Sequence, residues 1–312
     1  MKSLGSKAVD EKESPSSMKK TGDIQIRDPF VVPIEQEKRY YLYGTTDVNC
    51  WGPPGVGFDV FTSTDLKHWK GPLPAFRPPK DFWSDHNFWA PEVHRVSDRY
   101  FMFASFKAKD ICRGTQILVS DSPKGPFSPH SERPLTPSHW ESLDGTLYFD
   151  KDNYPWMVFC HEWIQVHDGE ICAVRLSPEF DQALGEPILL FRASEAPWVL
   201  KPEETDGATE KPNLVTDGPF LHRTKNGTLL MLWSSFSATG YTTGVARSLS
   251  GEIHGPWLQD PEPIYAKDGG HAMLFRTFEG QLMLSLHTPN KSPHERALFL
   301  PIAECEGRLH LL

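Results

Sequence analysis

The sequence predicts an all-β protein, a single-domain five-bladed β-propeller, and two observations lead to this prediction. Five apolar runs recur at spacings of 60, 55, 74 and 53 residues, counted between Tyr41, Phe101, Trp156, Leu230 and Met283. Glycine and proline together make up about one residue in six, which favours many turns. Five units of roughly 60 residues fit the radial repetition of a propeller. A two-sheet sandwich would also be all-β, but it does not predict the same order of elements five times.

Each unit contains the same elements in the same order. It opens with a short strand-like segment, found at 27–32, 89–94, 143–150, 216–223 and 269–275. An apolar run follows, at 39–46, 99–106, 154–163, 228–236 and 281–288. These runs are continuously apolar, as expected for strands that are buried on both faces. Third elements follow the first four runs, at 58–69, 115–127, 171–180 and 243–257, and the last unit ends in ALFLPIAECEGRLHLL.

Composition and charge exclude several classes of protein. The 41 acidic and 32 basic residues give a net charge of −9 without a basic stripe, so no nucleic-acid partner is expected. No apolar run reaches the roughly 18 residues of a membrane span, so no membrane partner is expected. The five cysteines are scattered without a CxxC pair, which predicts neither a disulfide framework nor a zinc site.

The first residues are polar and charged, and they lack the apolar segment of a secretion signal. We therefore expect residues 1–22 to form a flexible N-terminal arm and residues 23–312 to form the propeller. A cytoplasmic location is favoured on this ground. A secreted or periplasmic location remains open if a signal peptide has been removed.

The repeat brings distant carboxyl groups together. Because the first strand of each blade lines the central channel, equivalent starts converge on one end of it. Aligning the five starts places in one ring Asp28, Ala90, Asp144, Asp217 and Gly270, with His271 one position further on. Like charges in one cleft raise the pKa of at least one carboxyl group. An ionised carboxylate beside a protonated acid is what glycoside hydrolysis requires.

Aromatic side chains near this ring could offer flat faces to sugar rings. The candidates for substrate binding are Phe30, Trp51, Trp89 and Trp163. Trp89 stands at the start of the second unit, beside the predicted channel. The expected partner is therefore a carbohydrate.

The motifs IRDPF, STDLKHW, FWAPEV, SLDGTLYFD, DGPFL and GGHAM occur in this order from about residue 24 to the C-terminus. Together they resemble glycoside hydrolase family 43. The resemblance implies a five-bladed propeller and an inverting mechanism. By position, Asp28 matches the general base of that family. Asp144 matches the aspartate that orients the general acid and tunes its pKa.

The general acid departs from the family pattern. The family usually has a glutamate in an EGP motif of the fourth blade, and this chain has Asp217 in Thr216–Pro219. Aspartate is one methylene shorter, so the backbone must lie closer to the substrate or another group must take the role. Glu162, in the sequence HEW, is the alternative acid.

The resemblance also implies two further roles. His271 in GGHAM matches a histidine that faces a calcium ion or a water cluster in the channel, so calcium or another hard cation is a candidate cofactor. No organic cofactor is expected. Arg296, in HERALF, matches an arginine that approaches substrate hydroxyl groups.

The function predicted from the sequence is that of an inverting exo-acting glycosidase. The expected terminal sugar is α-L-arabinofuranosyl first and β-D-xylosyl second. Exo action is expected because the long segments 72–86 and 194–213 suit loops that close a pocket. An endo-enzyme with an open groove stays possible on sequence alone. The alternative function is a non-catalytic carbohydrate-binding propeller, which the change from EGP to DGP keeps open. A kelch- or WD-type interaction propeller would need signature repeats that this chain lacks.

Overall fold

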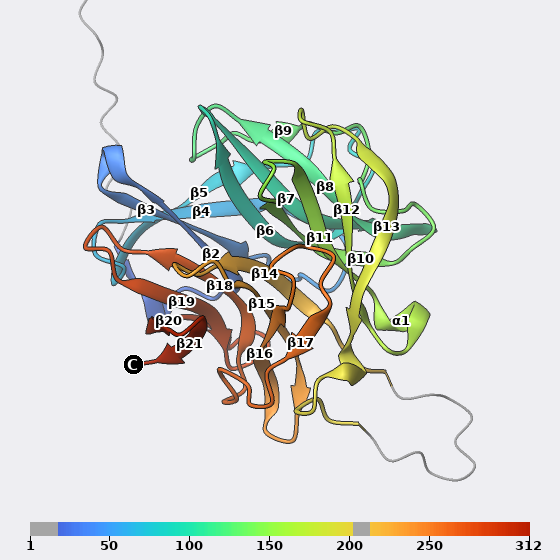
Figure 1. Cartoon of the computed structure of the whole chain (residues 1–312). Helices are drawn as coiled ribbons and strands as arrows, with labels where there is room; N and C mark the ends of the chain where they lie inside the picture. Colours follow the sequence, from blue (N-terminus) through green and yellow to red (C-terminus); the bar gives the residue numbers. More distant parts are fainter. Residues whose placement is uncertain (1–17, 202–212) are drawn as a thin grey trace, which may run out of the picture.

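A computed structural model describes residues 18–201 and 213–312 of the chain. Within these residues, 21 strands form five antiparallel sheets that are arranged around a common centre (Figure 1). The prediction of a five-bladed β-propeller is confirmed. In this part of the chain, no helix is long and apolar enough to cross a lipid bilayer.

Each sheet is one blade, and its strands follow one another in the chain from the channel outward. Blade one consists of β2 (Arg27–Ile34), β3 (Arg39–Thr45), β4 (Phe58–Ser63) and β5 (His68–Phe76), with β1 (Lys19–Lys20) at its outer edge. Blade two consists of β6 (His86–Val96), β7 (Arg99–Ala108), β8 (Ile111–Ser120) and β9 (Ser128–Pro129). Blade three consists of β10 (Ser142–Phe149), β11 (Pro155–His161), β12 (Glu170–Leu176) and β13 (Ala183–Arg192).

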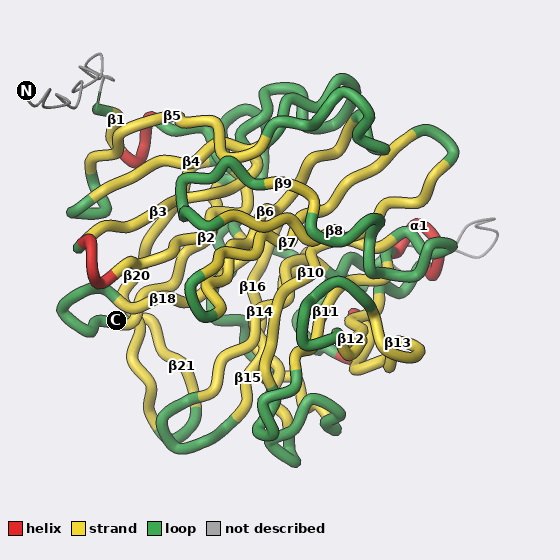
Figure 2. The backbone as a smooth tube through the Cα atoms, turned by 90° about the horizontal axis from the view of Figure 1, so that it is seen from above, coloured by secondary structure: helices red, strands yellow, loops and turns green. Residues whose placement is uncertain are grey.

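The last two blades complete the ring, which Figure 2 shows from above. Blade four consists of β14 (Asp217–Arg223), β15 (Leu229–Ser237), β16 (Gly240–Ser248) and β17 (Trp257–Gln259). Blade five consists of β18 (Gly270–Arg276), β19 (Leu282–Thr288), β20 (Arg296–Cys305) and β21 (Arg308–Leu311). Short helical turns lie between strands, at α1 (Trp163–Val166), η1 (Thr21–Asp23), η2 (Glu35–Glu37) and η3 (Ala193–Glu195).

The five apolar runs form the second strand of every blade, and their side chains build the core between blades. In β7 and β15 nearly every residue is buried, because both faces of the strand pack against neighbouring blades. The largest fully buried side chains include Trp69 and Trp233. The core is therefore a set of apolar layers between blades, and it holds the inner strands in place around the channel.

The ring closes between blade five and blade one without a shared strand. The backbone N–H of Ile26 donates to the carbonyl of Glu295 over 3.2 Å, and the Ser285 hydroxyl donates to the carbonyl of Pro29 over 2.7 Å. β1 pairs with β5, with Lys19 opposite Trp69. Residues 19–20 thus belong to blade one, and residue 22 is hydrogen-bonded to blade five, so the predicted flexible arm does not extend to residue 22. Residues 1–17 of that predicted arm lie outside the described residues.

All five inner strands contain a register shift near their start, where the pairing with the second strand skips residues. One residue in each shift has a positive φ, which is rare for residues other than glycine. These residues are Asp28 (55°), Ala90 (46°), Asp144 (57°), Gly218 (49°) and His271 (54°).

This bulge corrects the alignment made from the sequence. His271, not Gly270, is equivalent to Asp28, and Gly218, not Asp217, is equivalent to Asp144. Asp217 occupies the position before the bulge, like Arg27. A one-residue difference reverses the direction of a side chain on a strand, so the two kinds of position approach the channel differently.

A repeated hydrogen bond fixes the bulges. In four blades the N–H of the bulge residue donates to a side chain on the second strand of the preceding blade. The pairs are Ala90 to Thr45 (2.9 Å), Asp144 to Ser105 (2.9 Å), His271 to Ser234 (2.9 Å) and Asp28 to His287 (3.1 Å). The equivalent acceptor position for Gly218 is Cys160, and there the N–H donates to Asp144 Oδ2 over 3.0 Å instead. The exception therefore ties blade four directly to a carboxyl group of blade three.

Candidate active site

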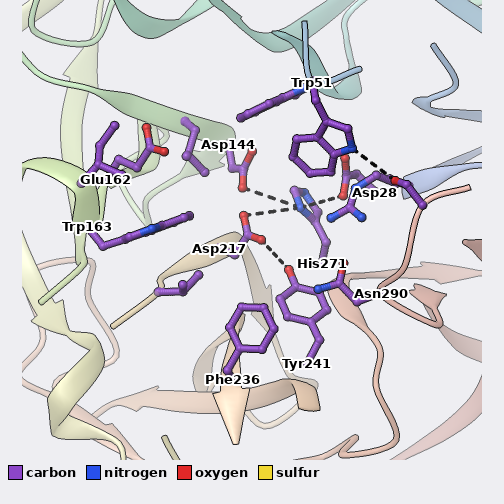
Figure 3. A pocket seen from close by; sticks show the side chains of 16 residues that line it. Asp28, Trp51, Asp144, Glu162, Trp163, Asp217, Phe236, Tyr241, His271 and Asn290 are labelled. Atoms are coloured by element: carbon purple, nitrogen blue, oxygen red, sulfur yellow. Dashed lines mark hydrogen bonds and ion pairs between the residues drawn. The ribbon is translucent and has the colours of Figure 1, made fainter. Parts of the chain in front are cut away.

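A cavity of about 470 Å³ lies at the end of the channel that carries the bulges (Figure 3). It combines carboxyl groups at its bottom with aromatic walls. Sixteen residues line it: Arg27, Asp28, Trp51, Trp89, Leu143, Asp144, Glu162, Trp163, Ile164, Val215, Asp217, Phe236, Tyr241, His271, Asn290 and Ser292. All four carboxylic residues singled out from the sequence are among them.

Three aspartates surround the His271 ring (Figure 3). The Nδ1 atom of His271 lies 3.2 Å from Asp28 Oδ1, 3.6 Å from Asp144 Oδ2 and 4.0 Å from Asp217 Oδ1. The inner strands of blades one, three, four and five thus supply the bottom of the cavity. The convergence expected from the repeat is present, although the alignment behind it was one residue out in two blades.

Asp28 is held as a carboxylate. Burial by itself raises the pKa of Asp28, but His271, Arg27 and the Thr45 hydroxyl outweigh it and bring the pKa below its ordinary value of 3.8. Thr45 donates to Asp28 Oδ2 over 2.7 Å. Burial also lowers the pKa of His287 to about 4, so this imidazole is neutral and its Nδ1 can accept the N–H of Asp28.

The pKa of Asp217 is shifted in the opposite direction. Burial and the neighbouring Asp144 carboxylate raise the pKa of Asp217 well above its ordinary value. Burial, together with the charge of Asp28, raises the pKa of Asp144 to about 6. The carboxyl groups of Asp144 and Asp217 share a hydrogen bond, which requires a proton on one of them. The higher pKa of Asp217 assigns that proton to Asp217, whose side chain is 20% exposed to the cavity.

Glu162 lies apart from the three aspartates in Figure 3. Its Oε2 accepts a hydrogen bond from the Arg113 guanidinium, which in turn donates to Asn87 and stacks 4.2 Å above the Trp89 ring. Burial raises the pKa of Glu162, and the Arg113 charge opposes this rise. Because a guanidinium can only donate, the paired oxygen carries no proton. This arrangement favours a supporting role for Glu162 at the Trp89 wall.

The cavity walls hold three of the four predicted aromatic residues. Trp51 and Trp89 meet edge to face with centroids 5.5 Å apart, and Trp163 at the start of α1 lies across the cavity from Trp51. Trp51 is 56% exposed, and its Nε1 donates to Ser292 over 3.3 Å. Exposed aromatic faces of this kind can stack against sugar rings.

Two predicted substrate-binding residues do not reach the cavity. Phe30 follows the bulge and packs deeper in the channel, with ring centroids 5.3 Å from His94 and 6.2 Å from Phe220. Arg296 begins the third strand of blade five, away from the channel. Its Nε donates to the carbonyl of Gly22 over 2.9 Å and its Nη1 to that of Pro293 over 3.1 Å. Arg296 holds the N-terminal segment onto blade five, so both placements from sequence were wrong.

Sequence reasoning missed several residues of the cavity. The guanidinium of Arg27 lies 5.0 Å from the Trp51 ring centroid and pairs with the buried Glu295 over 2.7 Å. Phe236, Tyr241 and Asn290 come from β15, β16 and the loop after β19, respectively. The only available signal was for Arg27, which directly precedes Asp28. The others stand at the ends of strands that no motif marks.

The cation expected at His271 has one structural argument in its favour. The Nε2 atom of His271 is buried and has no hydrogen-bond partner, so it could bind a water or an ion. Asp144, Asp217 and His271 each offer one possible ligand atom, and these three atoms lie within 4.8 Å of one another. That set does not fit calcium, which takes six to eight oxygen ligands, because Asp217 is held protonated. The calcium site stays a prediction.

Asp144→Asn is expected to increase the free energy of unfolding more at pH 8 than at pH 4. The folded pKa of Asp144, about 6, lies above the ordinary 3.8, so its contribution to stability is complete below about pH 4 and is lost as the pH rises through 6. At pH 8 the buried carboxylate costs up to about 3 kcal/mol. Asparagine removes this cost and tolerates the positive φ. Urea unfolding of both proteins at each pH checks this expectation, and an equal stability difference at both pH values would contradict it.

A five-bladed propeller with three carboxyl groups and aromatic walls at one end of its channel has the architecture of a propeller glycosidase. Residues 22–303 match the sequence profile of glycosyl hydrolases family 43. The chain belongs to this family, as its motifs predicted.

Individual relatives are similar over different lengths. The endo-arabinase from Bacteroides thetaiotaomicron VPI-5482 superposes with a TM-score of 0.84 at 42% identity, over 93% of this chain and 98% of that one. The extracellular endo-α-(1→5)-L-arabinanase 1 of Bacillus subtilis (strain 168) is 24% identical over 44% of this chain and 49% of its own length. Xylosidase/arabinosidase 43A of Humicola insolens is 30% identical over 26% and 24%. The aligned part thus spans half or less of these two curated relatives.

Proposed function

We propose that the protein is an inverting glycosidase that cleaves α-L-arabinofuranosyl linkages. The observation that carries this proposal is the opposite shift of two carboxyl groups in one cavity: the pKa of Asp28 is lowered and that of Asp217 is raised. Such a pair supplies one base and one acid at the same pH. The exposed tryptophan faces on the walls fit a sugar chain.

In the proposed reaction, Asp28 takes a proton from a water molecule, and the resulting oxygen nucleophile attacks the anomeric carbon. Asp217 gives its proton to the departing glycosidic oxygen. Asp144 keeps Asp217 protonated before the reaction and orients it through their shared hydrogen bond. Asp28 Oδ1 lies 3.2 Å and Asp217 Oδ1 lies 4.0 Å from the same His271 nitrogen, so these two oxygens are at most about 7 Å apart. This bound admits the lower end of the inverting range, about 6.5–9.5 Å, and also the roughly 5 Å of retaining pairs, so the inverting mechanism rests on the family and is tested by the anomer released.

The substrate that we propose is linear α-(1→5)-L-arabinan, cleaved within the chain. The support is the similarity, over nearly the whole length of both chains, to a protein described as an endo-arabinase. Removal of terminal arabinofuranosyl units, the action expected from the sequence, is the second candidate. It is favoured by the position of Asp28 and Asp144, which are buried at the bottom of a cavity. Part of the 194–213 segment used for that expectation lies outside the described residues.

Incubation with linear α-(1→5)-arabinan tests the proposal. Endo action is expected to release oligosaccharides of several lengths early, whereas exo action releases one small product from the start. Proton NMR during the first minutes should show the β anomer forming before mutarotation, because inversion replaces the α configuration. Initial formation of the α anomer would contradict the mechanism. Binding of arabinan without any hydrolysis would favour the non-catalytic carbohydrate-binding propeller.

A further inference from the structure

Tyr241, which no motif marked, contacts the proposed acid directly. It is the second residue of β16, in the same blade as Asp217. Its hydroxyl donates to Asp217 Oδ2 over 2.6 Å, as Figure 3 shows. This is a short hydrogen bond to a carboxyl group, and it comes from a side chain with 1% exposure.

The surroundings of Tyr241 leave its ring little freedom. The ring stacks on His287, with centroids 5.5 Å apart and an angle of 25° between planes, and it also contacts Phe236. Gly270 also lies close to the ring, and a Cβ atom there would come within 2.5 Å of Tyr241 Cε1. The backbone N–H of Tyr241 donates to Asp268 over 3.3 Å. The hydroxyl is therefore presented to Asp217 from a rigid position.

The hydrogen bond from Tyr241 matters because the side chain of Asp217 is short. An aspartate carboxyl sits one methylene closer to the backbone than a glutamate carboxyl, so its reach depends on how it is held. Asp144 bonds to Asp217 from one side and Tyr241 from the other. Together the two contacts determine the orientation of the carboxyl plane.

We propose that Tyr241 is a positioning residue that aims the shortened acid Asp217 at the glycosidic oxygen and stabilises the carboxylate formed when its proton leaves. The inference rests on the proposed function. During the step, the proton of Asp217 passes to the leaving oxygen as the bond from that oxygen to the anomeric carbon breaks. The new negative charge lies beside the Asp144 carboxyl, and the Tyr241 hydroxyl remains a donor to it throughout.

The test compares Tyr241→Phe with wild type, with Asp217→Asn, and with Tyr43→Phe as the matched control. Tyr43 is a fully buried tyrosine whose hydroxyl donates to the carbonyl of Pro123, remote from the cavity. Two substrates are used: linear arabinan, and a 4-nitrophenyl arabino-oligosaccharide whose leaving group needs little protonation. The pH dependence of kcat/KM is measured for each protein.

Tyr241→Phe is expected to lower kcat on arabinan by about 10- to 100-fold, the loss of a hydrogen bond to a charged group. The effect on the 4-nitrophenyl substrate should be several-fold smaller. The alkaline limb of the pH profile should move to higher pH, because the Tyr241 hydroxyl lowers the pKa of Asp217 and its removal raises that pKa. Tyr43→Phe should leave the limb and the ratio between substrates unchanged.

A purely structural role for Tyr241 predicts equal losses on both substrates and an unmoved alkaline limb, and that result would overturn the inference. An active wild type, an inactive Asp217→Asn and an unimpaired Tyr241→Phe would overturn only the role of Tyr241. No hydrolysis by wild type would overturn the proposed function and this role with it. Full arabinan activity in Asp217→Asn would overturn the assignment of Asp217 as the acid, and with it this role, while the arabinan-cleaving function would stand.

Discussion

Asp28→Asn is expected to lower kcat on linear arabinan by a factor of about 10²–10⁴, the contribution of a positioned general base. Asparagine has nearly the same shape, tolerates the φ of 55° at this position and can still accept the Thr45 hydroxyl. It cannot take a proton from water. The loss should therefore appear in kcat with little change in KM or in the free energy of unfolding. Initial rates on arabinan, together with urea unfolding, measure both quantities.

Chemical rescue distinguishes a missing base from a damaged fold. Asp28→Gly opens space beside the anomeric carbon, and glycine also adopts the positive φ. Azide, which needs no base, should restore turnover of a 4-nitrophenyl substrate and give a β-configured glycosyl azide. Asp121→Asn, at an exposed aspartate on blade two, is the control and should behave like wild type. An α-configured azide, or undiminished activity in Asp28→Asn, would remove Asp28 from the role of base.

Asp217→Asn is expected to lower kcat on arabinan by about 10²–10⁴-fold, because the departing sugar oxygen then receives no proton. The loss on a 4-nitrophenyl arabino-oligosaccharide should be far smaller, since nitrophenolate leaves as a stable anion. The alkaline limb of the pH profile, which we assign to ionisation of Asp217, should disappear for the substrate that still reacts. Steady-state kinetics on the two substrates across pH measure these effects.

Glu162→Gln is the matched comparison, since Glu162 is the other acid considered from the sequence. It removes the charge that pairs with Arg113, and Arg113 stacks on Trp89. We expect KM to rise on both substrates, with the ratio of their kcat values unchanged. If Glu162→Gln instead lost arabinan activity and kept nitrophenyl activity, the acid would be Glu162, and Asp217 would be part of its surroundings.

The hydrogen bonds that hold the five bulges explain how the Asp144 carboxyl group is brought next to Asp217. Four bulges are held by a hydroxyl or imidazole on the preceding blade, and only Gly218 lacks one, because its equivalent acceptor position is Cys160. The free N–H of Gly218 then donates to Asp144 Oδ2. A Cβ at residue 218 would also come within 2.7 Å of His271 Cγ. Glycine at this position thus lets blades three, four and five approach one another at the acid.

The sequence by itself was sufficient for the fold and for most of the site. Five apolar runs at similar spacing predict five buried second strands, because a strand that packs on both faces must be apolar throughout. The same repeat, with the short motifs, brought Asp28, Asp144 and Asp217 to one end of the channel. Three of the four predicted aromatic residues also line the cavity.

Only the tertiary structure decided the details on which the chemistry depends. The bulges displace the strand register by one residue. Sequence spacing cannot reveal this displacement, because Asp217 and Gly218 are neighbours in the same motif and spacing does not show which of them occupies the bulge. Phe30 and Arg296 were misplaced since their direction depends on that register and on the strand they occupy. The contrast between Asp217 and Glu162 arises from partners at distant positions: Tyr241 and Asp144 for one, Arg113 for the other. Protonation depends on such contacts between blades, because burial and neighbouring charge act through space and not along the chain.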